Sequence, residues 1–255
     1  MKSISSKSIS QLRELNPKLE HLYDKLIKRL IEGHLIGSTL VEGSTFTEYQ
    51  AQQVLNGKVI HGHAVDEHLE LTNGIQSASY IHRIFLQHEL ITTKHIDQAH
   101  KILMSGIGKP RDKTPGKNRG ATNLSAYTMR TEGSKLVEVQ YANPIEVKEQ
   151  YQAFLDFHIN KHLASNRKLA IGALAKLYFH FQMLHPYTDG NGRIGRFLVS
   201  AKVASELGYF FRFELNDGPE HLKIMMQMTG QYVKDKAKIS YSHLEKFLDK
   251  HLTSL

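Results

Sequence analysis

The sequence of 255 residues contains no cysteine and no tryptophan, and only six prolines. The lack of cysteine excludes structural disulfides and cysteine-ligated zinc sites, and it is compatible with a reducing, cytoplasmic environment. No run of about eighteen apolar residues occurs, so we expect no membrane span. The N-terminal stretch MKSISSKSISQLRELNP also lacks the apolar segment of a secretory signal.

Basic residues outnumber acidic ones by 33 to 25, which gives a formal net charge of +8. Such an excess suits nucleic acid, nucleotide phosphates or an acidic partner, and equally a solubilising surface. One stretch carries the basic run Lys109, Arg111, Lys113, Lys117 and Arg119. Because no aromatic residues are interleaved with these charges, we interpret the run as a solvated loop rather than a nucleic-acid surface.

Hydrophobic periodicity predicts a mostly helical chain. Leucines recur at three-to-four spacing in a helix expected over 18–41. The next helix is expected to open at Thr45, with Glu48 completing a capping box. Further helices are expected over 66–86, 93–104 (from Thr93), 144–162, 166–184, 193–207, 219–233 and 242–252.

Two stretches interrupt the helical pattern. Residues 106–123 are rich in glycine, proline and scattered charge, which predicts a long irregular loop. Residues 127–141 alternate between apolar and polar on both sides of an E-G-S turn, which is typical of a β-hairpin. No fixed-period repeat and no domain linker separates these elements.

The block HPYTDGNGRIGR, residues 185–196, contains the dinucleotide-binding pattern G-x-G-x-x-G. That pattern requires a buried strand running into the first glycine, whereas Pro186 cannot donate to a central sheet and the residues upstream have helical spacing. Asp189 would also repel a pyrophosphate. In favour of a dinucleotide-binding fold, YFFRFEL would suit a second strand, with Glu214 at about the expected distance. The residues before the glycines outweigh this, so a dinucleotide-binding site is disfavoured. No G-x-x-x-x-G-K-[ST] motif occurs either.

As chemistry, the block is coherent. Backbone N–H groups of Gly190, Asn191 and Gly192 at a helix start form a cradle for an anion. Arg193 and Arg196, three residues apart, add cationic donors for further phosphate oxygens.

Two residues before the glycines complete the set. Asp189 suits Mg²⁺, which proteins often hold with one carboxylate plus substrate phosphates. His185 is within reach of that carboxylate as a general base near neutral pH. The combination indicates phosphoryl or nucleotidyl transfer to a hydroxyl.

The block resembles the Fic-domain signature H-x-F-x-[D/E]-G-N-G-R-x-x-R, with Tyr187 in place of phenylalanine, a change that should keep the packing. The resemblance covers most of the chain, including a hairpin at the place of the family's flap. It implies a mainly α fold, a Fic-type helical bundle with one β-hairpin flap at about 125–141. Residues 1–90 would form an N-terminal helical region and residues 91–255 the catalytic domain.

The resemblance also implies an activity. Fic proteins are mostly protein adenylyltransferases that move AMP from ATP to a Ser, Thr or Tyr hydroxyl of a target protein, and the reverse removal of AMP is left open here. By this resemblance His185 would deprotonate the hydroxyl and Asp189 would hold Mg²⁺. The α- and β-phosphates would be bound by Gly190, Asn191 and Gly192. Arg193 would add a phosphate contact, and Arg196 would hold the γ-phosphate. The helix over 219–233 lacks the family's adenine-pocket tyrosines and asparagine. On this point the sequence indicates a nucleoside phosphate and does not specify ATP.

A second motif lies upstream. Ser38 and Glu42 share one helix face, and Gly43 suits the residue after the helix end. From the residues alone, Glu42 is interpreted as an exposed side chain in the last turn of the helix, where the negative end of the helix dipole is unfavourable for a carboxylate. The resemblance implies more, because S/T-x-x-x-E-[G/N] is the family's inhibitory motif. Glu42 would then pair with Arg196, from a helix at about 30–43, and occupy the γ-phosphate position.

Two hypotheses of different class remain. The first is an autoinhibited adenylyltransferase that binds ATP with Mg²⁺ and a target protein on the hairpin, with no membrane or nucleic-acid partner expected and a homo-oligomer left open. The second is a non-catalytic nucleotide or nucleic-acid binding module. His185 discriminates between them, because a binding module has no need of a base. His158 and His162 have metal-ligand spacing, but no third ligand is evident, which favours surface histidines.

Overall fold

The computed structural model describes residues 36–38, 42, 44–87, 90–107, 114–132, 135–213 and 217–254. The helices are α3 (Glu48–Leu55), α4 (Val65–Leu86), α5 (Thr93–Leu103), α6 (Arg119–Thr122), α7 (Pro144–Phe154), α8 (Arg167–Leu184), α9 (Asn191–Leu207), α10 (Gly218–Lys234) and α11 (Ser242–Lys250). A π-helical turn (Leu155–Ile159) follows α7, and a 3₁₀ turn (Lys236–Lys238) follows α10. The strands are β1 (Tyr127–Glu132), β2 (Lys135–Gln140), β3 (Tyr209–Phe211) and β4 (Leu252–Ser254).

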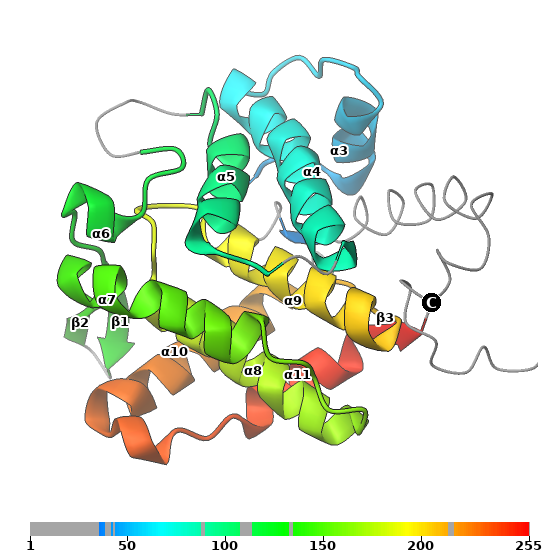
Figure 1. The fold of residues 1–255 in the computed structure, drawn as a ribbon. Coiled ribbons are helices and arrows are strands. Elements are labelled where there is room, and N and C mark those ends of the chain that lie inside the picture. Colours follow the sequence, from blue (N-terminus) through cyan, green and yellow to red (C-terminus); the bar gives the residue numbers. More distant parts are fainter. Residues whose placement is uncertain are drawn as a thin grey trace, which may run out of the picture.

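Helix α9 lies at the centre of the molecule, with α4 and α5 on one side and α8, α10 and α11 on the other (Figure 1). Nearly all its side chains are buried, as expected of a helix surrounded by protein. Gly195 permits the close approach of α8, because a Cβ there would lie 2.6 Å from Gln182 Nε2 and 3.1 Å from the Tyr178 ring. The mainly α fold with one hairpin is therefore confirmed.

The hairpin agrees with its sequence pattern: β1 pairs antiparallel with β2, from Tyr127 opposite Gln140 to Glu132 opposite Lys135. The second sheet differs from expectation. Strand β3, inside the YFFRFEL stretch, pairs antiparallel with β4, and β4 shortens the helix expected over 242–252. An antiparallel two-stranded ribbon beside helices is incompatible with a parallel dinucleotide-binding sheet.

Two helix starts differ from the sequence analysis. Thr47, not Thr45, caps α3, in a capping box with Gln50. Thr45 is engaged elsewhere, because its backbone N–H and its hydroxyl both donate to Glu67 Oε2 at 2.8 Å. The start of α5 differs only in its cap: the helix begins at Thr93, as expected, and Thr92 caps it.

The remaining differences have local causes. The helix expected over 144–162 stops being α-helical at Phe154, and the carbonyls of Ile159 and Lys161 accept hydrogen bonds from the buried Lys202 (2.8 and 2.9 Å) instead of continuing it. The loop expected over 106–123 contains the short helix α6. Of the helix expected over 18–41, only residues 36–38 fall among the described residues, and they are helical.

Among the residues that the structure describes, no helix combines the length and apolar character needed to cross a bilayer.

Buried histidines should make the fold sensitive to acid. Burial lowers the pKa of His82 and His100 to about 4 and that of His221 to about 3. Between these values and the ordinary value of about 6.5, the unfolded chain binds protons that the folded chain does not, so stability is present above pH 6.5 and is lost as pH falls. Each such histidine should lower the free energy of unfolding by about 1.4 kcal/mol per pH unit in this window.

Urea unfolding between pH 7 and 5 would measure this dependence. His82→Gln should flatten the slope by about one proton. His162→Gln, at a side chain that is 87% exposed, is the control for replacing a histidine at the surface. Equal slopes in wild type and His82→Gln would contradict the assignment.

Candidate functional site

The turn between α8 and α9 carries the motif. His185 ends α8 in a left-handed conformation (φ 47°, ψ 61°), and Gly190 precedes α9 with φ 75°. Glycine is required at 190, because φ is positive and a Cβ would lie 3.2 Å from both Leu103 Cδ2 and Met104 Sδ. The Asn191 side chain closes the turn on the backbone of Tyr187, accepting from its N–H (3.0 Å) and donating to its carbonyl (2.8 Å). The first N–H groups of α9 are thereby held in a fixed, largely buried turn, where they lack partners within the helix.

His185 has the protonation state of a base. Its Nδ1 donates to the carbonyl oxygen of Gln182 (3.1 Å), so the lone pair of the neutral ring is on Nε2. The Tyr141 ring stacks on the imidazole, with centroids 3.7 Å apart and planes at 2°. Burial lowers the pKa of His185 to about 4, so the ring is neutral at pH 7.

Asp189 combines an exposed carboxylate with a fixed backbone. Its side chain is 42% exposed, lies 3.7 Å from Arg193 Nη2, and its Oδ1 accepts from the N–H of Gly190 (2.6 Å). Its carbonyl oxygen accepts from His100 Nε2 (3.1 Å), while His100 Nδ1 accepts from the N–H of Gly116 (3.0 Å). His100 therefore orients the peptide that leads into the turn at Gly190.

The structure is compatible with a magnesium ion that depends on a nucleotide. Among the described residues, no group of three or more His, Asp or Glu side chains could hold a metal alone. Mg²⁺ commonly takes one or two carboxylates and completes its shell with phosphate oxygens and water. The partly exposed carboxylate of Asp189 fits that requirement.

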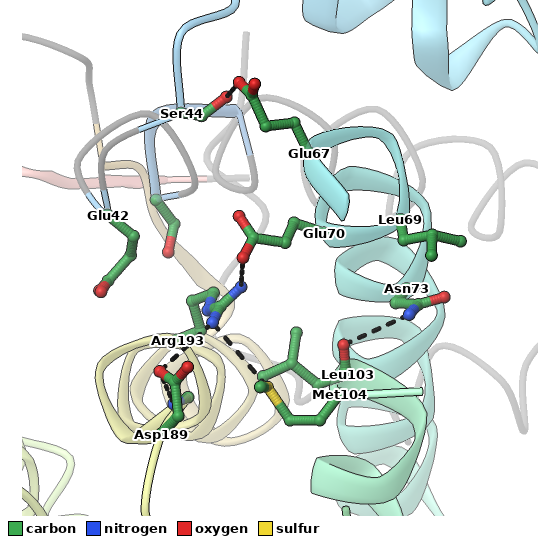
Figure 2. A network of polar contacts seen from close by, with 12 residues as sticks. Glu42, Ser44, Glu67, Leu69, Glu70, Asn73, Leu103, Met104, Asp189 and Arg193 are labelled. Carbon is green, nitrogen blue, oxygen red and sulfur yellow. Dashed lines mark hydrogen bonds and ion pairs between the residues drawn. The ribbon is translucent and has the colours of Figure 1, made fainter. Parts of the chain in front are cut away.

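Arg193 is a buried cation whose hydrogen-bonding capacity is only partly used. Its side chain is 3% exposed and lies between Glu70 of α4 (Nη1 to Oε1, 3.5 Å) and Asp189 (Figure 2). Nη2 also contacts Met104 Sδ at 3.9 Å. Within the described part of the chain, Nε and Nη1 form no hydrogen bond. A buried donor left unsatisfied is costly, and a site for a ligand is one explanation for such a group.

Arg196 is instead fully engaged from the N-terminal region. Nε donates to Ser38 Oγ (2.7 Å), and Nη2 donates to the Ser38 carbonyl (3.2 Å) and to Glu42 Oε1 (2.5 Å). The guanidinium also lies over the Phe213 ring, 5.2 Å from its centroid. Gly43 and most of the region 30–43 lie outside the described residues.

Glu42 lies against the start of α9. A Cβ on Gly192 would come within 2.5 Å of Glu42 Oε1, so the carboxylate occupies the space next to the cradle. Partial burial alone would raise the pKa of Glu42, but the charge and hydrogen bond of Arg196 outweigh it and lower that pKa. The carboxylate is therefore ionised at neutral pH.

Several residues of the site were not identified from the sequence. Arg119 had been assigned to a solvated basic run, yet its side chain is fully buried and donates to the carbonyl of His185 (2.7 Å). Lys117 of the same run is exposed, and Lys109, Arg111 and Lys113 lie outside the described residues. Nothing in their sequence context distinguished Arg119 from its neighbours.

His158 and His162 have different surroundings. His158 Nε2 is 3.0 Å from His180 Nδ1, whereas His162 is 87% exposed and lies 3.6 Å from Glu206. His162 is thus a surface histidine, as predicted, whereas the prediction was wrong for His158, which is half-buried against His180.

Tyr187 also does more than pack. Its hydroxyl donates to Asp97 Oδ1 (2.8 Å) and accepts from the Tyr151 hydroxyl (2.9 Å), and its ring stacks on His100. The motif is thereby linked to α5 and α7.

A cavity of about 770 Å³ lies beside the hairpin stem. Tyr141 forms part of its wall, together with Phe154, Phe157, Met183 and Tyr232. Tyr141 also stacks on His185, which is not itself one of the residues lining the cavity.

Comparison with known proteins agrees with the geometry. Residues 90–201 match the model of the Fic/DOC family. Protein adenylyltransferase Fic of Nematostella vectensis is 25% identical over 179 residues, which are 69% of this chain and 38% of that protein. The Drosophila erecta protein of the same name is 24% identical, over 78% of this chain and 37% of its own length. The chain thus spans under two fifths of these relatives.

Solved structures share the fold. A Fic-domain-containing signaling protein from Bacteroides thetaiotaomicron superposes with a TM-score of 0.71 at 18% identity, covering 92% of this chain and 85% of that one. Fic-1 of C. elegans (residues 134–508) gives 0.64 at 20% identity, covering 86% and 58%.

The Tyr187 network allows a stability test. Tyr187→Phe keeps the ring but leaves the buried Tyr151 hydroxyl and Asp97 each without one partner. The loss should lower the free energy of unfolding by about 1–3 kcal/mol, measured by urea titration. In a double-mutant cycle with Tyr151→Phe, the second change should then cost less than it does alone. Additive losses would show that the two hydroxyls are not coupled.

Proposed function

The chain carries a domain of the Fic/DOC family over residues 90–201, and on that premise we propose that it is a protein adenylyltransferase. It would transfer AMP from ATP to a Ser, Thr or Tyr hydroxyl of a target protein. One observation carries the proposal: the neutral imidazole of His185 and the buried Arg193, whose Nε forms no hydrogen bond among the described residues, flank the same short turn. The relatives named protein adenylyltransferase support the same reaction.

The chemistry follows from these positions. His185 Nε2 accepts the proton of the target hydroxyl as its oxygen bonds to the α-phosphorus of ATP. The bond to the bridging oxygen of the β-phosphate breaks, and pyrophosphate leaves. The N–H groups at the start of α9 and the Arg193 guanidinium stabilise the charge on the phosphate oxygens. Mg²⁺, held by Asp189 and the phosphates, would supply further charge neutralisation.

The hairpin is the proposed docking edge for the target. Strands β1 and β2 form a two-stranded sheet, so each has an edge that can pair with an added strand. Tyr127, Met129 and Leu136 of the hairpin are exposed apolar side chains. Tyr141, directly after β2, contacts His185, so a docked segment would lie near the base.

We further propose that Ser38 and Glu42 inhibit the enzyme. The Glu42 carboxylate and a γ-phosphate would compete for the same guanidinium, and the tethered carboxylate is always at high local concentration. Its position against Gly192 adds a steric obstacle next to the cradle. ATP could then bind only in a pose unsuited to transfer.

The role of His185 is tested by His185→Ala. Transfer of label from α-³²P-ATP to protein should fall by about 10²–10⁴-fold, the usual contribution of a general base. Binding of ATP with Mg²⁺, measured by calorimetry, should change little because the cradle belongs to α9. His82→Gln serves as the control for removing a buried histidine elsewhere, and an EDTA arm tests the metal. Undiminished labelling by His185→Ala would refute the mechanism.

The inhibitory role is tested by Glu42→Gly and Glu42→Gln. A partly shielded charge-assisted pair is worth about 1–3 kcal/mol, so either change should raise labelling about five- to hundredfold. Glu48→Gln, on the exposed first turn of α3, is the matched control and should leave labelling unchanged. Adding Arg196→Ala should remove the gain, because the released guanidinium is needed by ATP. If both Glu42 variants labelled at the wild-type rate while binding ATP equally well, no such inhibition would operate.

A further inference from the structure

Arg119, the first residue of α6, has a fully buried side chain. Its guanidinium donates four hydrogen bonds to backbone carbonyls, those of Leu124 (3.2 Å), Ala142 (2.6 Å), Leu184 (3.2 Å) and His185 (2.7 Å). Its backbone N–H donates to the carbonyl of Pro186 at 2.6 Å. This residue therefore makes more contacts to the backbone around the motif than any side chain within the motif does.

The four carbonyls belong to two parts of the molecule. Leu184 and His185 end helix α8 and carry the proposed base. Leu124 lies shortly before β1 and Ala142 shortly after β2, so they belong to the two stems of the hairpin. One side chain thus fixes the separation between the base and the hairpin.

The shape of the guanidinium matters as well as its charge. A buried cation is costly unless its charge and donors are compensated. In the part of the chain that the structure describes, the partners of Arg119 are carbonyl oxygens, two of them at the negative end of the α8 dipole. Lysine could place a charge there, but a single ammonium lacks the planar fork that reaches both stems.

His185 depends on this support because its backbone is strained. A non-glycine residue at φ 47° persists only where surrounding contacts enforce it. Arg119 holds its carbonyl, Gln182 holds its Nδ1, and the Tyr141 ring covers its face. Tyr141 is itself part of a hairpin stem, since its N–H donates to the Ala126 carbonyl (3.1 Å). The orientation of the imidazole is therefore set jointly by α8, through Gln182, and by the hairpin stem, through Tyr141.

We propose that Arg119 is a positioning residue that holds the His185 imidazole and the hairpin stems at a fixed separation, so that a hydroxyl presented by the hairpin meets Nε2. This inference rests on the proposed function, because it takes His185 as the base and the hairpin as the docking edge. The phosphate cradle is held by other contacts, Asn191 on Tyr187 and His100 on Asp189. Nucleotide binding is accordingly independent of Arg119.

The test uses Arg119→Lys and Arg119→Met in the full chain carrying Glu42→Gly. A displacement of about 1 Å can cost about 10²-fold in rate, so kcat for self-labelling from α-³²P-ATP should fall about tenfold with lysine and about hundredfold with methionine. The Kd for ATP with Mg²⁺ should stay within about twofold, since the cradle is unchanged. Arg167→Lys is the matched control, because Arg167 also donates to carbonyls, those of Asp249 and Leu252, away from the base. It should leave kcat unchanged.

A second readout does not depend on activity. The ¹⁵N NMR signals of the His185 imidazole report its tautomer, and Arg119→Lys should reduce the share that carries the proton on Nδ1. A parental kcat or an unchanged His185 spectrum in Arg119→Lys would overturn the proposal. If Arg119→Met does not fold, Arg119→Lys decides alone. If the parent transfers no label, the proposed function fails, and the spectra still decide whether Arg119 positions His185.

Discussion

The cost of burying two guanidinium groups at the start of α9 governs the arrangement around the motif. Arg193 and Arg196 are both nearly inaccessible to solvent, and a buried charge must be compensated by partners or by a ligand. The compensation comes from outside the motif, from Glu70 on α4 and from Glu42 near the N-terminal region, with Asp189 alone contributed by the motif. The packing of α4, of Ser38 and of Glu42 against α9 is therefore partly electrostatic.

The same environment sets the state of the base. Burial keeps His185 neutral, and its bond to Gln182 leaves Nε2 as the basic nitrogen. A histidine with a low pKa is a weak base, so it depends on being held where the hydroxyl arrives rather than on its proton affinity. This requirement gives a physical reason for the left-handed backbone at His185 and for the number of contacts that enforce it.

The sequence predicted the parts of the fold that depend on local pattern. The hairpin, the helix ending at Leu184 and the turn into α9 all follow from periodicity and glycine placement. The parts that depend on distant partners were not predicted: Thr45 is drawn from its expected capping role by Glu67, and β4 forms because β3 lies alongside it. Arg119 and Glu70 were missed for the same reason. Their partners, the carbonyl oxygens around Arg119 and the Arg193 guanidinium beside Glu70, are distant in sequence, so each residue resembles a solvated surface charge until the fold is known.

Arg193 and Arg196 differ in how far their hydrogen-bond donors are already occupied without a nucleotide. Arg196 has three hydrogen bonds to Ser38 and Glu42. Arg193 has ion pairs to Glu70 and Asp189, and its Nε forms no hydrogen bond among the described residues. A phosphate reaching Arg193 would satisfy donors that are already desolvated, so that contact forms at little further cost. A phosphate reaching Arg196 would first have to displace a carboxylate and a hydroxyl. Without nucleotide, Arg193 is thus available to a phosphate, whereas Arg196 is occupied by Ser38 and Glu42. This favours an order of binding in which the α- and β-phosphates bind first and the γ-phosphate reaches Arg196 afterwards.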